Sequence, residues 1–504
     1  MRIALDRGSD EPLYRQIQAF LSDSILSGSM APGTRLPATR ALAADLGVSR
    51  MTVESAYAEL EADGLVAAQV GSGTFVLPPF PVRPAAGDAP GTAWPAWHHG
   101  RRWETEGAHA AWTATPLDAA VPAAGHTHPI PFAGGGGDAR RFPIDEFRRT
   151  IQAVMRRDGT AAVEYGDPRG YPPLRATIAQ VLASQGLQAS AGNVLVTAGS
   201  QAALALVSHL LLGPGDVVVV EKPTYGGALQ LFRALGVVMA EVPVDAEGMQ
   251  LDALEPILRA RRPRLIYTIP NFQNPTGTCL SSSRRRQLLA LADRHGVPVV
   301  EDDFVGDLRY DGRAQPALKA LDPGGRVIYA STFSKMLMPG LRVGFLVADG
   351  PVYDRLVRYK RAVELATSNL MQRALEAYVT VGRYQAHLRR SCQLYRRRRD
   401  AICRAIEGWL PGDLEFGVPA GGLFAWVRLP DGIDAAALLP AAQAEGVAFA
   451  PGRDFFVDAR DGARTMRLNF AACTVEEIDQ GVRRLGRIVT QRYAETHGEA
   501  RREK

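Results

Sequence analysis

Residues 327–342 read VIYASTFSKMLMPGLR, an apolar run that turns polar where it ends. The run from Val327 to Ala330 is short and apolar, which is typical of a strand buried on both faces of a parallel sheet. Four similar runs precede it, and segments with helical periodicity separate them: 193–197, 217–220, 265–269 and 297–300. Strands that alternate with helices predict an α/β unit with a mostly parallel sheet from about residue 129 onward.

Polar residues follow every one of these runs, at the edge where open parallel sheets bind ligands. A Gly-Ser turn after the first run opens a helix, and the free N–H groups there suit an anion, most often a phosphate. An aromatic ring, an amide, a carboxylate and a lysine follow the later runs. In chain order the candidate residues are Gly199, Ser200, Gln201, Tyr225, Asn274, Asp302, Thr332, Ser334, Lys335 and Arg342.

This set matches the chemical needs of pyridoxal 5′-phosphate. The aldehyde of that cofactor condenses with a lysine amine as a Schiff base. A carboxylate keeps its pyridine nitrogen protonated, so that the ring can withdraw electrons. The chain has only five lysines, and Lys335 alone follows a buried strand within a phosphate-binding sequence. The sequence therefore predicts a pyridoxal phosphate site with Lys335 as its catalytic residue.

The local sequences around these residues resemble the fold type I aminotransferases, in the same order along the chain. The matching segments are EKPTY at 221–225, NPTG at 274–277, EDDF at 301–304 and STFSK at 331–335. The resemblance covers residues 129–504 and implies a mostly parallel sheet followed by a small C-terminal α+β subdomain.

The resemblance also implies a role for each residue. Lys335 is expected to form the Schiff base, Asp302 to pair with the pyridine nitrogen, and Asn274 to hydrogen-bond the ring hydroxyl. Tyr225 is expected to stack on the ring. The residues expected to hold the phosphate are Gly199, Ser200, Gln201, Thr332, Ser334 and Arg342.

Two more residues match from outside these segments, and two positions depart from the pattern. Tyr165, in EYGDPRGYPPLR, matches a tyrosine that reaches the cofactor of the partner subunit, and Arg467, in MRLNF, matches the arginine that holds a substrate carboxylate. Phe304 stands where relatives commonly carry a tyrosine that bonds the ring oxygen, which leaves that oxygen more dependent on Asn274. Gly227 stands where relatives that respond to γ-aminobutyrate carry an arginine, so γ-aminobutyrate is not the expected effector.

The first 77 residues predict a separate small domain. Apolar residues at 13, 17, 20, 21 and 25 have helical spacing, and a second helix is expected around 38–46, before Gly47. A third helix is expected to start at the N-cap residue Ser49. Residues 65–76 alternate around a Gly-Ser-Gly tip, which indicates a hairpin. Three helices and a hairpin predict a winged helix-turn-helix, whose third helix enters the major groove of DNA.

This segment resembles the GntR family of bacterial repressors over nearly its whole length. The resemblance is carried by GTRLP at 33–37, by Arg40 and by SRMTV at 49–53. Ala38 departs from the family, which usually carries a serine there that caps the second helix. The residues expected to contact DNA are Arg35, Arg40, Ser49, Arg50 and Thr52, with Gly71, Ser72 and Gly73 at the hairpin tip.

A GntR-type head joined to an aminotransferase-like unit resembles the MocR/GabR family of transcription regulators over almost the entire chain. The resemblance implies a regulator of promoter DNA that works as a head-to-tail homodimer. An amino compound held by Arg467 is expected to displace Lys335 and form an external aldimine, which changes DNA binding. Two alternatives stay open: an active aminotransferase with an accessory DNA-binding head, and a sensor of the cofactor level itself.

Residues 78–128 are rich in Pro, Ala and Gly and are expected to be a linker between domains 1–77 and 129–504. The histidines there lack the spacing of metal ligands, so no metal is expected. Four cysteines far apart indicate a reducing compartment, and no segment is apolar enough to cross a membrane, so a cytoplasmic protein is expected.

The formal charge of +5 is distributed unevenly. Residues 1–77 hold six basic and nine acidic residues, a net charge of −3, so the basic balance lies outside the predicted DNA-binding head. Arginine clusters at 284–286 and 396–399 lie in helix-like segments. A solvated helix face and a secondary contact with DNA explain them about equally.

Overall fold

In this computed structural model the described residues are 3–9, 11–63, 65–69, 72–77, 129–333, 335 and 337–499. The chain divides into two compact units, which are described separately. The expected linker at 78–128, and the candidate residues Gly71 and Ser334, lie outside the described residues. The domain boundaries at 77 and 129 therefore stay predictions.

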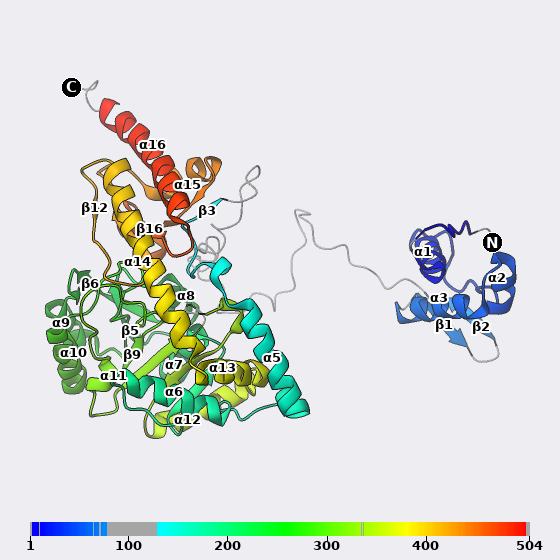
Figure 1. Ribbon diagram of the computed structural model, residues 1–504, viewed down its shortest axis with the longest axis horizontal. Coiled ribbons are helices and arrows are strands. Elements are labelled where there is room, and N and C mark those ends of the chain that lie inside the picture. The colour runs from blue at the N-terminus through cyan, green and yellow to red at the C-terminus, as the bar shows by residue number, and fades with distance from the viewer. Residues whose placement is uncertain are drawn as a thin grey trace. The chain divides into compact units, whose positions relative to one another are not determined.

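The N-terminal unit has three helices and a hairpin, drawn in blue in Figure 1. Ile17, Leu21 and Ile25 form the buried face of the first helix. Gly47 ends the second helix with a φ of 63°, a conformation that glycine adopts readily, and Ser49 caps the third by accepting a hydrogen bond from the Thr52 amide. The elements are α1 Leu13–Leu26, α2 Thr39–Leu46, α3 Arg50–Ala62, β1 Val66–Gln69 and β2 Gly73–Val76. The predicted winged helix-turn-helix is confirmed.

The large unit is built on one sheet of eight strands, in the order β4-β11-β10-β9-β8-β5-β6-β7. Strands β5, β6, β8, β9 and β10 pair in parallel with their neighbours in this group, whereas β11 and β7 pair antiparallel. The bounds are β4 Val194–Thr197, β5 Val217–Lys222, β6 Val238–Asp245, β7 Gly248–Met249, β8 Leu265–Thr268, β9 Val299–Asp302, β10 Val327–Thr332 and β11 Gly344–Val347. The predicted mostly parallel sheet is confirmed, although β9 starts at Val299 rather than Val297.

Helices cover both faces of this sheet. Helices α9, α10 and α11 bury one face, with Val219, Ile266 and Val299 from the strands, while α6, α7, α8 and α12 bury the other. Their bounds are α6 Pro172–Ser184, α7 Ser200–Leu211, α8 Gly226–Ala234, α9 Leu251–Arg261, α10 Ser282–His295, α11 Leu318–Leu321 and α12 Pro351–Glu364. Because neighbouring residues on a strand point to opposite faces, both faces need apolar cover, which explains the continuous apolar runs.

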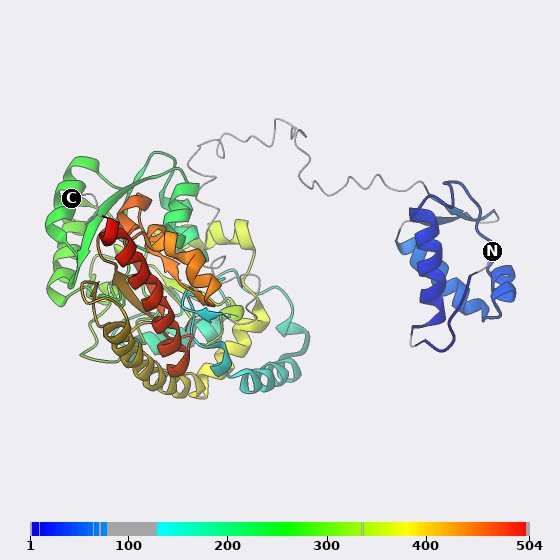
Figure 2. The ribbon, with the colours of Figure 1, turned by 90° about the horizontal axis from the view of Figure 1, so that it is seen from above.

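The C-terminal part is a small α+β subdomain with a sheet in the order β12-β13-β16-β15. Figures 1 and 2 show α16 lying alongside the long helix α14. The elements here are α14 Arg383–Trp409, β12 Glu415–Phe416, β13 Phe424–Arg428, α15 Ala435–Ala444, β14 Val447–Ala448, β15 Ala450–Pro451, β16 Thr465–Asn469 and α16 Val475–Glu499, while α13 Asn369–Thr380 packs on α5 and α6. The start of the unit joins this subdomain, because β3 Ile130–Pro131 pairs with β14.

The unit also contains the helix α5 Ile144–Asp158 and the 3-10 turns η3 Ala139–Arg141, η4 Gly159–Ala162, η5 Pro339–Leu341, η6 Gly452–Phe455 and η7 Ala459–Gly462. Within the described ranges, none of the helices combines the length and the apolar character needed to cross a bilayer.

Candidate functional site

A cavity of about 310 Å³ opens where the parallel strands of the large sheet end. Six of the predicted site residues line it: Ser200, Tyr225, Asn274, Asp302, Lys335 and Arg467. They come from the ends of different strands and from β16 of the small subdomain, so the fold brings together residues that are far apart in sequence. Phe304 and Gly227, the two departures from the expected pattern, line the same cavity.

Lys335 lies just beyond β10, in the turn before η5. Burial is the largest influence on its amine, and the positive charges of Arg467 and Arg342 act in the same direction, so its pKa falls to about 8. A lowered pKa leaves more of the amine neutral near physiological pH, and the neutral amine is the nucleophile.

Asp302 is the last residue of β9 and is buried. Its Oδ2 accepts a hydrogen bond of 2.9 Å from the Tyr267 hydroxyl, whereas its Oδ1 has no hydrogen-bond partner among the described residues. Burial raises the pKa of this carboxyl to about 7. A buried carboxylate oxygen without a donor is unfavourable, and the protonated nitrogen of a pyridine ring is the kind of donor that it lacks.

Arg467 lies on β16 between the rings of Phe424 and Phe455, with its guanidinium carbon 4.1 Å and 4.9 Å from the two ring centres. It donates to Asn274 Oδ1 at 2.9 Å and to the Ala133 carbonyl at 2.9 Å, while its buried Nε has no partner among the described residues. Burial lowers its pKa to about 10, which still leaves it charged at neutral pH.

The contact with Arg467 also orients the amide of Asn274. Since the carbonyl oxygen of that amide accepts from Arg467, its NH₂ group is the part left to donate to a ligand.

Tyr225 is the N-cap residue of α8, and burial raises the pKa of its phenol. Its ring occupies the space that a side chain on Gly227 would need, since a Cβ there would lie 2.5 Å from the ring. Phe304 stacks on Phe424 and offers the cavity no hydroxyl.

The residues predicted to hold a phosphate lie around the start of α7. Gly199 precedes that helix with a φ of 96°, and a Cβ on it would lie 2.9 Å from Arg342 Nη2. Arg342 donates to the Ala198 carbonyl at 2.8 Å. Gln201 donates to the Gly227 carbonyl, and its buried Oε1 has no partner among the described residues. Thr332 is buried at the end of β10 and donates to the Val343 carbonyl.

Tyr165 is the one described candidate of the large unit that lies away from this site. Its side chain is 87 % exposed, and it borders a separate open cavity formed by residues 162–166 and 366–370. This position agrees with a tyrosine that does not serve the cofactor of its own chain.

A run of glycines that the sequence reasoning missed forms one wall of the cavity. Gly134, Gly135 and Gly136 line it, and a Cβ on Gly135 would lie 3.5 Å from Lys335 Nζ. Asn469 holds this segment by donating to the carbonyls of Gly134 and Gly136 at 2.8 Å. The signal was present as FAGGGGD at 132–138. Other lining residues had no comparable signal: Gly226, Gln230, Ile269, Pro339 and Phe455.

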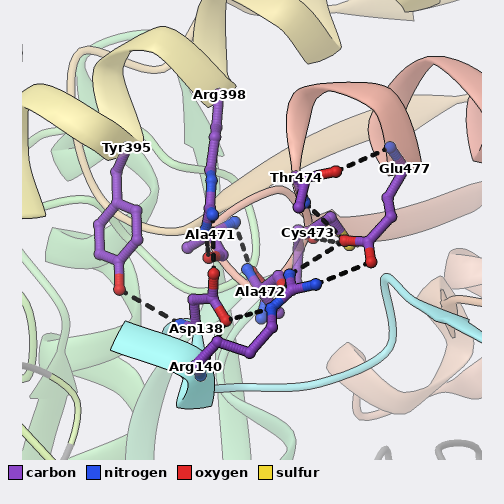
Figure 3. Close-up of polar contacts among 10 residues, drawn as sticks. Asp138, Arg140, Tyr395, Arg398, Ala471, Ala472, Cys473, Thr474 and Glu477 are labelled. Atoms are coloured by element: carbon purple, nitrogen blue, oxygen red, sulfur yellow. Dashed lines mark hydrogen bonds and ion pairs between the residues drawn. The ribbon is translucent and has the colours of Figure 1, made fainter. Parts of the chain in front are cut away.

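The glycine run is anchored at its end by a buried ion pair (Figure 3). Asp138 accepts from Arg398 at 2.7 Å and from Arg140 at 2.8 Å, and Arg140 also pairs with Glu477 of α16. The Tyr395 hydroxyl accepts from the Asp138 amide at 3.2 Å. Burial alone raises the pKa of Asp138, but the hydrogen bonds from the two arginines outweigh it and hold that pKa below its usual value.

In the N-terminal unit, the predicted DNA-contacting residues lie in three places: Arg40 on α2, Ser49, Arg50 and Thr52 at the start of α3, and the rest at or beside the hairpin. Arg35, Arg40, Ser49 and Arg50 are exposed, as is Ser72 at the tip, while Thr52 and Gly73 are half-buried. Arg50 forms a 2.6 Å ion pair with Glu54 on the next turn of α3. If Arg50 contacts DNA as the sequence predicts, a phosphate has to compete with this carboxylate for it.

Comparison with known proteins gives two matches to family models. Residues 13–76 match the family described as bacterial regulatory proteins, gntR family, and residues 137–485 match aminotransferase class I and II. A protein named probable rhizopine catabolism regulatory protein MocR, from Rhizobium meliloti, is 35 % identical and covers 90 % of this chain and 89 % of its own. The regulator TauR of Rhodobacter capsulatus is 33 % identical, with coverages of 96 % and 97 %.

Among solved structures, the α-aminoadipate aminotransferase LysN of Thermus thermophilus is similar to the large unit. It is 36 % identical with a TM-score of 0.71, and the match covers 77 % of this chain and 97 % of that one. That protein was solved as a complex with N-(5′-phosphopyridoxyl)-L-leucine.

Proposed function

The chain belongs to the MocR-type transcription regulators, which join a GntR-family DNA-binding region to an aminotransferase class I and II unit, and on that premise we propose that its large unit is a sensor of amino compounds. The match to class I and II aminotransferases supports pyridoxal phosphate as the cofactor. When bound, this cofactor supplies an electrophilic carbon that an amine can occupy and a ring that stabilises negative charge.

The residues of the cavity fit this cofactor. Lys335 provides an amine whose lowered pKa favours the neutral form. Asp302 has an oxygen without a donor and can hold a proton on the ring nitrogen. Asn274 presents its NH₂ group to the ring oxygen, and Tyr225 provides a flat surface for the ring. The remaining residues proposed to hold the phosphate are Gly199, Ser200, Gln201, Thr332, Ser334 and Arg342.

Arg467 points to the class of effector. Among the described residues, it is the only cationic side chain that lines the cavity besides Lys335. An amino compound with a carboxylate satisfies both groups, because its amine takes the place of the Lys335 amine while Arg467 binds its carboxylate. Gly227 stands where relatives that respond to γ-aminobutyrate carry an arginine. Because Gly227 adds no charge to this cavity, we do not propose γ-aminobutyrate as the effector.

We also propose that the protein works as a head-to-tail homodimer in the cytoplasm. Val163, Tyr165 and Leu365 are exposed apolar or aromatic residues with exposed fractions of 61 %, 87 % and 56 %. Tyr165 and residues 366–370 border one open cavity, which supports contact with a second copy there. A monomer in analytical ultracentrifugation at micromolar concentration contradicts this part of the proposal.

The observation that carries the proposal is the meeting of Lys335, Asp302 and Arg467 in one cavity of a chain that also carries a DNA-binding head. Deleting residues 1–77 tests the division of labour. We expect the truncated protein to lose promoter binding and to keep the visible absorbance of the lysine-bound cofactor. Protection of promoter DNA by the truncated protein contradicts the proposal.

An active aminotransferase is the second candidate, because Lys335, Asp302 and Arg467, which transamination would use, line one cavity. Incubation with amino acids and 2-oxo acids separates the two functions. Sustained product formation on the order of 1 per second or faster favours the enzyme. At most one product per subunit favours the sensor.

A further inference from the structure

Most of the positive charge of the large unit is concentrated on one helix. Helix α14 carries eight arginines against two acidic residues, a net charge of +6, which exceeds the +5 of the whole chain. The DNA-binding head, by contrast, has six basic and nine acidic residues, a net charge of −3. The charge that attracts a polyanion is therefore not on the domain that reads DNA.

Some arginines of α14 belong to the fold. Arg398 and Arg399 are buried and pair with Asp138 and Asp311, respectively. Arg396 is exposed but also pairs with Asp311, at 3.0 Å. Arg398 and Arg399 are therefore held within the fold, whereas Arg396 shares the carboxylate of Asp311 with Arg399.

Four other arginines form a row on the outer side of α14. Arg383, Arg390, Arg397 and Arg404 recur every seven residues, which is close to two helical turns, so they lie along one side of the helix. All four are exposed. We call them the arginine row. It runs from residue 383 to residue 404, a rise of 21 steps or roughly 31 Å at 1.5 Å per residue.

The arginine row lacks neutralising partners. Within the part of the chain that the structure describes, Arg390, Arg397 and Arg404 form no ion pair and no hydrogen bond, and Arg383 donates only to the Thr150 hydroxyl, at 3.2 Å. Arg389, beside the row, is also exposed and has no such partner. Figure 1 shows α14 running uncovered across the near side of the large unit.

The surroundings of the row contain few carboxylates. On α14 itself, Asp400 is bound by the buried Arg399 at 2.7 Å, which leaves Glu407 in the last turns. On the packed helices, Glu146 of α5 lies near the start of the row, where it accepts a hydrogen bond from Tyr378 at 3.4 Å. The row therefore meets few carboxylates apart from Asp400 and Glu407, which flank Arg404 on α14.

We propose that the arginine row is a second DNA-binding surface, which contacts phosphates without reading sequence. The chain is a DNA-binding regulator, so duplex DNA is the polyanion that it meets at work. Arginine forks pair with phosphate oxygens, and a row of roughly 31 Å is comparable to one turn of the duplex, about 34 Å. The row supplies the electrostatic attraction that the acidic head lacks.

The test is the salt dependence of binding by the full-length protein to a mixed-sequence duplex of roughly 60 base pairs, about six helical turns. The variant is R390Q/R397Q/R404Q, which removes three charges from an exposed helix face and keeps residues with good helix propensity. The logarithm of the binding constant falls as the logarithm of the salt concentration rises, and each lost phosphate contact makes this slope less steep by about 0.9. We expect the slope of this variant to be less steep by roughly 2 to 3.

A matched control variant separates the loss of phosphate contacts from the loss of net positive charge. R259Q/R326Q/R460Q removes three arginines that are paired with Glu255, Asp293 and Asp458, respectively, and it changes the net charge equally. We expect this control to keep the slope of the unmodified protein. An equal change in both variants, or no change in the first, overturns the proposal. A first variant with unchanged DNA binding but a lower mass in sedimentation assigns the row to contact with a second copy and also overturns it.

Discussion

Lys335 and Asp302 face the same cavity, and burial shifts the pKa of each toward neutrality. The pKa of Lys335 falls to about 8, and the pKa of Asp302 rises to about 7. Burial penalises both charged forms, and each charge only partly offsets the penalty on the other. Without its cofactor, the cavity therefore holds a lysine that loses its proton readily.

This lowered pKa predicts how the rate of cofactor binding depends on pH. The neutral amine of Lys335 attacks the cofactor aldehyde, so the rate of reconstitution should rise with pH, with a midpoint near 8, and level off above it. Stopped-flow absorbance of cofactor-free protein mixed with pyridoxal phosphate measures this rate. A midpoint near 10.5, the ordinary value for lysine, contradicts the electrostatic account, and Lys335→Ala should show no absorbance change at any pH.

Arg50 allows a prediction at the DNA-binding surface. Glu54→Gln removes the carboxylate that pairs with Arg50 at 2.6 Å, so the arginine becomes free to bind a phosphate. Exposed pairs contribute about 0.2–1 kcal/mol, so DNA affinity should rise by at most about fivefold. Fluorescence anisotropy with a promoter fragment measures the change. Glu59→Gln on the same helix removes the same charge without releasing Arg50, and an equal gain in that control refutes the role of the pair.

At the scale of elements, α2 of the head starts without a side-chain cap. Its N-cap residue is Ala38, which makes no capping hydrogen bond, whereas Ser49 caps α3. Ala38→Ser should supply this bond and raise the free energy of unfolding of the head by about 1 kcal/mol. Chemical denaturation followed by a probe in the head measures the gain. An unchanged midpoint shows that the serine hydroxyl does not reach the helix amides.

The glycine segment beside Lys335 depends on the ion pair between Asp138 and Arg398, which is buried. Asp138→Asn leaves the arginine charge without its carboxylate and should destabilise the large unit by about 3–5 kcal/mol. Asp458→Asn, which breaks an exposed pair with Arg460, serves as the control and should change stability by at most about 1 kcal/mol. Urea unfolding measures both, and equal effects contradict a stabilising role for the buried pair.

The sequence predicted the elements that have a local signal. The strand ends that carry Tyr225, Asp302 and Lys335 were predictable because short apolar runs stop at polar residues, and the head was predictable from helix caps and a Gly-Ser-Gly tip. The pairing of Asp138 with Arg398 was not predictable, because 260 residues separate them and only the packed fold joins them. Phe455 and Gln230 were missed for the same reason.

At the scale of the whole molecule, the two units divide the chemistry between them. The head carries, at the start of α3, the side chains that we expect to contact DNA, and the large unit carries the cavity with Lys335 and Arg467. A regulator requires that the state of the cavity changes the affinity for DNA, since allostery is a coupling free energy between two sites. The sign of that coupling decides whether the effector strengthens or weakens binding.

The most direct test measures the affinity of the full-length protein for a promoter fragment without cofactor, with pyridoxal phosphate, and with pyridoxal phosphate plus a panel of carboxylate-bearing amino compounds. We predict that at least one amino compound changes the affinity of the cofactor-loaded protein by about 5- to 150-fold, and that Lys335→Ala abolishes this change. A change between the first two states alone indicates a sensor of the cofactor level. Equal affinity in all three states contradicts the account.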